Sequence, residues 1–439
     1  AVVTIVMASC TSDIEETTAT TGKSNVQLVV GEFPAFGDSQ TRTIGTPDPG
    51  KTSWAVGDEL LLVIDNTSYG SHSATFTYNG KSWELTSGEL VYREGDPAYI
   101  PHVYYAPNYK WSNTSLMLKK GKVAGTDELI EGKARITGNG ETITVSFAGA
   151  TRKYSRLRIA TLPNEQITVD TEYFTPAGSS DMEQEGNYTL TSDEKGNAYL
   201  YGTFENNSEV TVKYREAALT TYTFSQATES AKSYALDATV ISANSAEEIK
   251  SAIKQKVADG KTTIRLNLAP NAGTDEFMAI REAIKGAAPN DEGTIELTII
   301  GVETIPEEAF YKMLQLKSVR MSDVKEIKKY AFKECQYLTV VEAPSLNKLC
   351  SGAFKKCDQL AKLTFGPINY ADERNWPIFE DITPNIDLIL SDYQKEMIET
   401  DSYLYTANND RDYAGSDEHN SKNFLGRVFK SITCRYRVK

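Results

Sequence analysis

The chain has 439 residues, of which 40% are hydrophobic and 24% are charged, and this is the composition of a folded protein with two or three domains. Its formal net charge of -14 argues against a nucleic-acid or anionic-membrane partner, because such partners require clustered Lys and Arg that displace counterions. The three His and five Cys do not have the spacing of a zinc site, so we expect neither a metal nor another cofactor.

Residues 1–10 form a short apolar stretch that ends in a cysteine. The run AVVTIVMAS carries no charge and is too short to span a bilayer, which requires about 20 residues. Small residues directly before Cys10 are typical of a signal-peptide cleavage site. The stretch resembles the lipobox of a bacterial lipoprotein, and the acidic residues after it resemble the signal for export to the outer face of the outer membrane. The resemblance implies that Cys10 is lipidated and anchors the protein at the cell surface, followed by a flexible tether at 11–24.

Short alternating strands separated by turn signals, such as Asn79-Gly80, predict two all-β sandwiches in tandem. We expect the first sandwich to cover residues 25–141 and the second to cover residues 142–243. The expected strands of the first lie at 25–30, 59–65, 73–79, 82–86 and 102–106. Those of the second lie at 142–147, 155–162, 166–175, 187–191, 198–204, 210–214, 220–224 and 234–240.

A set of short motifs runs through both sandwiches. They are Thr41-Arg42-Thr43, Trp54-x-x-Gly57-Asp58-Glu59, the strand 74–78 with Trp83, Tyr104-Tyr105-Ala106-Pro107, and Ser233-Tyr234-Ala-Leu236. In order and spacing they resemble the fimbrillin family, the subunits and accessories of type V pili. The resemblance covers residues 25–241 and implies two transthyretin-like sandwiches in a lipoprotein precursor. It also implies that an Arg-specific protease cuts at Arg42 and removes the strand at 25–30, so that a strand from another subunit can enter. The alternative is that Arg42 is an ordinary loop arginine.

Residues 45–52 fit the letters of a phosphate-binding loop, G-x-x-x-x-G-K-[ST]. Such a loop works only at the start of a helix, whose backbone amides hold the phosphates. Two prolines lie inside this loop and a strand follows closely, which leaves no room for that helix. We therefore expect no nucleotide partner.

After residue 243 the hydrophobic period changes from that of strands to that of helices. Ser245 and Glu248 form a capping box that begins one helix, and residues 274–285 form a second. Strands are expected at 263–268 and 294–300. These units predict an N-terminal cap that covers the open edge of the domain that follows.

A repeat of 22 residues occupies positions 302–368. Three aligned segments, at 305–310, 327–332 and 349–354, each end in Ala-Phe, and further apolar columns return at the same spacing. These columns are Val302, Val324 and Leu346; Met313, Cys335 and Cys357; Leu316, Leu338 and Leu360; and Val319, Val341 and Leu363. The pattern resembles the BspA-type leucine-rich repeat, which implies a surface protein that binds other proteins and is not a catalyst. The predicted fold is therefore two transthyretin-like sandwiches followed by an α/β leucine-rich repeat solenoid at 244–439, with caps at both ends.

Cys335 and Cys357 share one column on adjacent coils, so a disulfide between them is geometrically conceivable. The alternative, which this column favours, is that each cysteine is a compact buried hydrophobe.

The expected ligand surface is the outer face of the repeat strands. Side chains between the inward Leu and Val columns should alternate outward. They are Lys317, Ser318, Arg320, Thr339, Val340, Glu342, Ala361, Lys362 and Thr364. An ordinary solvated face is the alternative.

The sequence favours a cell-surface lipoprotein that mediates adhesion, with a protein ligand or pilus subunits as partners. It could serve as a minor tip or accessory component of a type V pilus. A binding lipoprotein of a glycan or nutrient capture system, with the sandwiches as spacers, is the alternative. No nucleophile motif or catalytic constellation is present, so we expect no enzymatic activity.

Overall fold

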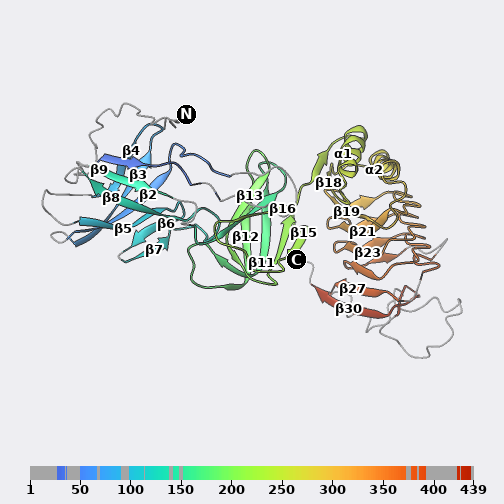
Figure 1. The fold of residues 1–439 in the computed structure, drawn as a ribbon. Coiled ribbons are helices and arrows are strands. Elements are labelled where there is room, and N and C mark those ends of the chain that lie inside the picture. Colours follow the sequence, from blue (N-terminus) through green and yellow to red (C-terminus); the bar gives the residue numbers. More distant parts are fainter. Residues whose placement is uncertain are drawn as a thin grey trace, which may run out of the picture. The chain divides into compact units, whose positions relative to one another are not determined.

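The computed structural model describes residues 27–34, 36, 50–66, 70–89, 98–112, 114–137, 142–147, 152–371, 377–382, 385–391, 423–425 and 427–436. Within these ranges the chain consists mostly of strands, with two helices, and it divides into two compact units (Figure 1). One unit comprises residues 1–212 and 220–238, and the other comprises 213–219 and 239–439. None of the helices in the described part is long and apolar enough to cross a membrane. The predicted sites Cys10 and Arg42 lie outside the described residues.

The strands of the first sandwich form a seven-stranded sheet in the order β1-β9-β8-β5-β2-β3-β4. The strands are β1 (Gln27–Val30), β2 (Glu59–Asn66), β3 (Gly70–Tyr78), β4 (Trp83–Gly88), β5 (Ala98–Tyr105), β8 (Ile130–Thr137) and β9 (Thr142–Ser146). Alternate side chains such as Leu60, Leu62 and Val145 are buried in one core, as the period of two in a strand requires. A separate hairpin, β6 (Tyr109–Ser112) with β7 (Ser115–Leu118), was not predicted.

The predicted boundary between the sandwiches is wrong. Residues 142–147 were assigned to the second sandwich, whereas β9 pairs antiparallel with β8 and parallel with β1 in the first. The local alternation of this segment specifies a strand but carries no information about its partner. The boundary therefore falls after β9.

The second sandwich has the strand order β15-β14-β11-β13-β10-β16, and β12 pairs with β11 outside this path. Its strands are β10 (Ser155–Ala160), β11 (Gln166–Pro176), β12 (Glu183–Thr191), β13 (Asn197–Phe204), β14 (Glu209–Tyr214), β15 (Ala217–Thr223) and β16 (Ser233–Asp237). Its first strand, β10, pairs parallel with its last, β16. The first sandwich repeats this feature, because β1 pairs parallel with β9.

The second unit contains an eight-stranded sheet whose strands all run parallel, in the order β17-β18-β19-β21-β23-β25-β27-β30 (Figure 1). They are β17 (Ile241–Ala243), β18 (Thr263–Leu268), β19 (Ile295–Ile300), β21 (Leu316–Met321), β23 (Val340–Ala343), β25 (Lys362–Phe365), β27 (Asp387–Ser391) and β30 (Ser431–Tyr436). A smaller parallel sheet joins β20 (Thr304–Ile305), β22 (Glu326–Ile327), β24 (Lys348–Leu349) and β26 (Tyr370–Ala371), and a hairpin joins β28 (Asn423–Phe424) to β29 (Arg427–Val428).

Two helices, α1 (Ala246–Ala258) and α2 (Thr274–Ala287), lie at one end of this stack. Helix α1 begins where the sequence predicts, because the Ser245 hydroxyl accepts a hydrogen bond from the Glu248 N–H at 3.3 Å. The buried face of α2, including Phe277 and Ile280, joins the same continuous core as the repeats.

The repeat register is confirmed, since Val319 pairs with Val341 and Val341 with Leu363, one coil of 22 residues apart. Phe310, Phe332 and Phe354 form a stacked ladder in the core, with ring centroids 5.1 and 5.4 Å apart. All three rings are fully buried. The predicted Ala-Phe column is therefore the centre of the packing.

Cys335 and Cys357 are buried free thiols and not a disulfide. Each Sγ donates to a backbone carbonyl of the preceding coil, Cys335 to Phe310 and Cys357 to Phe332, both at 3.0 Å. Each cysteine of this column thus behaves as a compact hydrophobic residue with one weak hydrogen-bond donor.

Burial raises the pKa of the Cys335 thiol to about 12. Because the thiolate is the reactive form, we expect Cys335 to resist alkylation by iodoacetamide at pH 8 in the folded protein and to react fully in denaturant. Mass spectrometry of the alkylated peptides measures both states. Rapid labelling of the native protein at Cys335 would show that this column is open.

Candidate functional site

Six of the nine predicted surface residues lie in two rows that run across the outer face of the eight-stranded sheet. Ser318, Val340 and Lys362 are register partners in one row. Arg320, Glu342 and Thr364 are register partners in the other. Successive parallel strands are about 4.8 Å apart, so the rows bring side chains from different coils together.

The remaining three residues form a column at the start of the strands. Thr339 donates through both its N–H and its hydroxyl to the Lys317 carbonyl, at 2.9 and 2.8 Å, and the Ala361 N–H donates to the Thr339 carbonyl. Thr339 therefore joins one coil to the next. Lys317 and Ala361 are exposed.

Charge pairs connect the coils across this face. Arg320 binds Glu342 at 3.0 Å, and Lys362 reaches the same carboxylate at 4.0 Å. Lys317 pairs with Glu296 of the preceding strand at 2.9 Å. These partly exposed ion pairs add little stability, because exposed pairs contribute about 0–1 kcal/mol. They instead fix the positions of polar groups on the surface.

One prediction for this face is wrong, because Ser318 is buried, with 6% of its surface exposed. Its short side chain lies between those of Glu296 and Val340 on the neighbouring strands. Alternation placed the residue on the outer face but did not predict its accessibility.

The N-terminal end of the rows is covered. Thr298 and Arg265, which precede Arg320 in its row, are buried, and Arg265 donates to the Leu219 carbonyl at 2.5 Å. Leu219 belongs to residues 213–219, which cluster with this unit. The accessible part of the face therefore begins at the coil of Arg320.

The rows also continue beyond the predicted residues at their C-terminal end. Asp387 pairs in register with Lys362 and Ser431, and Ile389 pairs with Thr364 and Thr433. Asp387 accepts from Ser431 at 2.6 Å and from Lys430 at 3.0 Å. These residues were not predicted to belong to the surface, because the spacing from Lys362 to Asp387 is longer than the regular coil of 22 residues.

The face presents charges of both signs and hydroxyl groups on a rigid sheet. From residue 302 to residue 371 the chain carries eleven Lys and Arg against eight Asp and Glu, so this region is basic within a chain of net charge -14. Among the described residues no group of three or more His, Cys, Asp or Glu could hold a metal ion. The arrangement suits recognition of a polar macromolecular surface.

Comparison with known proteins identifies part of this unit. Residues 295–391 match the BspA type leucine rich repeat region, in six copies. No curated protein matches the chain. Among solved structures the chain is similar to GBS52, the minor pilin of the Gram-positive pathogen Streptococcus agalactiae, with 8% identity, a TM-score of 0.18, and coverage of 49% of this chain and 93% of the pilin. A TM-score this low defines neither fold nor function.

Proposed function

We propose that the protein is a cell-surface adhesion or protein-interaction protein, not an enzyme, that binds its protein ligand through the accessible rows of the repeat sheet. The observation that carries this proposal is the pair of outward rows, built by register from successive coils of a region that matches the BspA-type repeat. Stacked coils supply a continuous surface of variable side chains, which is how repeat proteins recognise partners.

The two sheets of the repeat region offer a matched pair of lysines for a test. Lys362 on the larger sheet contacts Glu342 at 4.0 Å with 46% of its side chain exposed, and Lys348 on the smaller sheet contacts Glu326 at 2.7 Å with 41% exposed. A panel of purified matrix and cell-surface proteins on a sensor chip is the probe. For a protein that binds, Lys362→Glu should weaken binding at least tenfold, or about 1.4 kcal/mol, while Lys348→Glu changes it less than twofold. Equal losses in both variants, or no binder in the panel, would contradict the proposal.

We further propose that the chain joins a type V pilus as an acceptor of a strand. Support comes from β1, a strand of four residues at the sheet edge that, among the described strands, pairs only with β9. Removal of such a strand exposes unpaired backbone groups on its neighbour, and these demand a replacement strand. The strand β30 is less suited to donation, because it is paired with β27.

The acceptor role predicts a single cut. An Arg-specific protease should cleave the folded protein at Arg42, and the cleaved protein mixed with fimbrillin should give ladders on gel electrophoresis without boiling. Arg42→Ala is the control and should give neither the cut nor the ladders. Resistance of Arg42 in the wild type, or filaments of this protein alone, would rule out the acceptor role.

The surface location rests on lipidation of Cys10 and anchoring in the outer membrane. Labelled fatty acid should enter the wild type and not Cys10→Ser, and equal labelling of both would exclude the anchor.

A further inference from the structure

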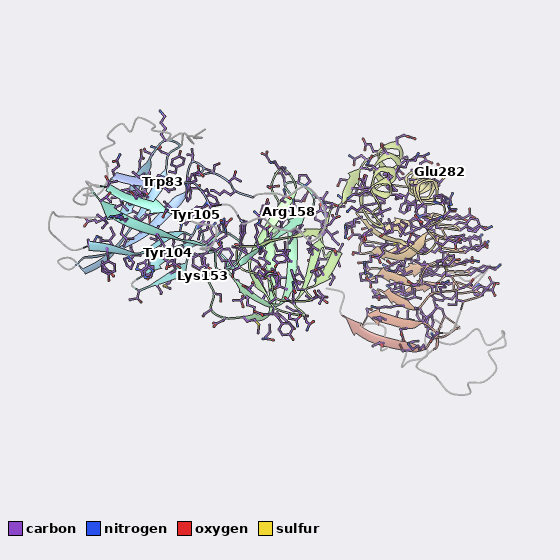
Figure 2. The ribbon with its side chains drawn as sticks, in the orientation of Figure 1. Trp83, Tyr104, Tyr105, Lys153, Arg158 and Glu282 are labelled. Atoms are coloured by element: carbon purple, nitrogen blue, oxygen red, sulfur yellow. The ribbon has the colours of Figure 1, made fainter. Side chains whose placement is uncertain are left out.

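The segment that follows β1 carries two aromatic side chains, Phe33 and Phe36, in adjoining pockets. Arg152 contacts both rings, at 5.8 Å from the centre of Phe33 and 4.0 Å from the centre of Phe36. The Phe33 ring lies 4.9 Å from Trp54 and 5.4 Å from Tyr105, edge to face in both cases, and it is buried. Trp83 and Tyr105, labelled in Figure 2, both pack on Trp54. The Trp54 indole N–H donates to the Gly31 carbonyl at 2.8 Å, which fixes the backbone just before Phe33. The first pocket is therefore an aromatic box within the first sandwich.

The second pocket is built from cations. The guanidinium groups of Arg152 and Arg156 lie 4.0 and 4.6 Å from the centre of the Phe36 ring, and Tyr201 stacks at 6.5 Å. Both arginines are only 1% exposed. Arg152 also donates to the Pro34 carbonyl at 2.6 Å and is held by the Glu128 carboxylate at 3.3 Å. The pocket thus contacts both the aromatic ring of Phe36 and the backbone carbonyl of Pro34.

An aromatic ring suits this pocket better than an aliphatic side chain. A guanidinium is attracted to the face of a ring by the ring quadrupole, and the attraction increases when both groups are removed from water. An aliphatic side chain of similar volume would fill the space but would not compensate the desolvation of two buried cations. The pocket should therefore discriminate phenylalanine from leucine.

The strand β1 itself offers less discrimination. It has four residues, and of these only Leu28 is buried, while Val29 is 38% exposed. Its ladder with β9 uses backbone groups that any extended segment can supply. Selectivity must come from the side chains that follow it.

We propose that the groove beside β9 selects a strand of another chain that is followed by an aromatic-x-x-aromatic pattern, and that residues 27–36 occupy this site in cis. This proposal depends on the acceptor role in one respect: an incoming strand must take the place of β1. Its new content is the chemical identity of the partner: an extended segment whose first aromatic residue enters the box at Trp54 and Tyr105 and whose second lies against Arg152 and Arg156.

The test uses the full chain with the recognition sequence of a specific protease inserted between Phe36 and Gly50. After cleavage, the protein is refolded from denaturant with an excess of a fluorescent peptide of residues 25–36, and binding is followed by anisotropy. The wild-type peptide and Val29→Ala should bind equally, while Phe33→Ala, Phe36→Ala and Phe36→Leu should bind at least tenfold more weakly.

Phe36→Leu is the decisive variant, because it retains volume and loses the ring. Binding of Phe36→Leu within twofold of the wild type would overturn the proposal, as would an equal loss in Val29→Ala or no entry of the wild-type peptide after refolding. If Arg42 is not cut, or if no ladders form with fimbrillin, the proposed pilus role is wrong. The selectivity for the peptide can still be correct in that case, so the experiments distinguish the two proposals.

Discussion

Phe332→Ala is expected to destabilise the repeat region by about 3–5 kcal/mol, the usual cost of truncating a buried aromatic side chain. The ring is fully buried between Phe310 at 5.1 Å and Phe354 at 5.4 Å, so its removal leaves a cavity and deprives both neighbouring rings of a stacking partner. The coils above and below share backbone hydrogen bonds with this turn, including Phe310 N–H to the Ala331 carbonyl at 2.8 Å, which limits collapse into the cavity.

Native-state hydrogen exchange measures this loss locally, because amides of β21 and β23 report the opening of the coils that flank Phe332. Lys328→Ala is the control, since Lys328 is exposed in the turn of the same coil. It should change protection by less than about 0.5 kcal/mol, the usual effect of a surface substitution. A loss below about 1 kcal/mol for Phe332→Ala would show that the ladder does not hold the coils together.

The repeat region could be predicted well because its stabilising contacts are regular in sequence. Phe310, Phe332 and Phe354 return every 22 residues, and a parallel stack turns that period directly into contact. Where the spacing lengthens, before Asp387, the place of this strand in the surface rows was missed. The 22-residue period therefore predicts which residues contact one another, and the prediction was incomplete where the period changed.

The sandwiches were harder because strand partners are set by contacts far apart in the sequence. Residues 142–147 alternate like any strand, and nothing local indicates that β9 pairs with β1, more than a hundred residues earlier. The pockets around Phe33 and Phe36 were missed for the same reason. They combine residues from segments far apart in the sequence, and Arg152 and Arg156 resemble ordinary charged residues in the sequence although they are buried. Recognised motifs, Trp54 and Tyr105 among them, did mark one of these pockets without revealing what it holds.

Arg152→Met is expected to destabilise the first unit by about 3–5 kcal/mol, because it leaves the buried Glu128 carboxyl group without its compensating charge. Arg152 and Glu128 are 1% and 3% exposed, and the pair is held at 3.3 Å. The adjacent pair Lys153–Glu131 has a shorter contact of 2.9 Å, but the two side chains are 83% and 36% exposed. Lys153→Met is therefore a matched control, and it should cost no more than about 1 kcal/mol. Tryptophan fluorescence in urea reports mainly this unit, because three of the four tryptophans, Trp54, Trp83 and Trp111, belong to it.

The double variant Arg152→Met with Glu128→Leu distinguishes two effects of Arg152→Met: the loss of the ion pair with Glu128, and the cost of a buried Glu128 without its partner. Burial raises the pKa of Glu128 above its ordinary value of 4.5, and the charge and hydrogen bonds of Arg152 oppose that shift. Without Arg152 the folded protein should hold a proton on Glu128 that the unfolded chain releases, so the stability of Arg152→Met should fall as the pH rises above 4.5. Removing the carboxylate should abolish this pH dependence and recover most of the stability at pH 7, since an apolar replacement of both partners avoids the desolvation penalty. A double variant no more stable than Arg152→Met at pH 7 would mean that the contribution of Arg152 lies in its contacts with Phe36 and Pro34 and not in its charge pair.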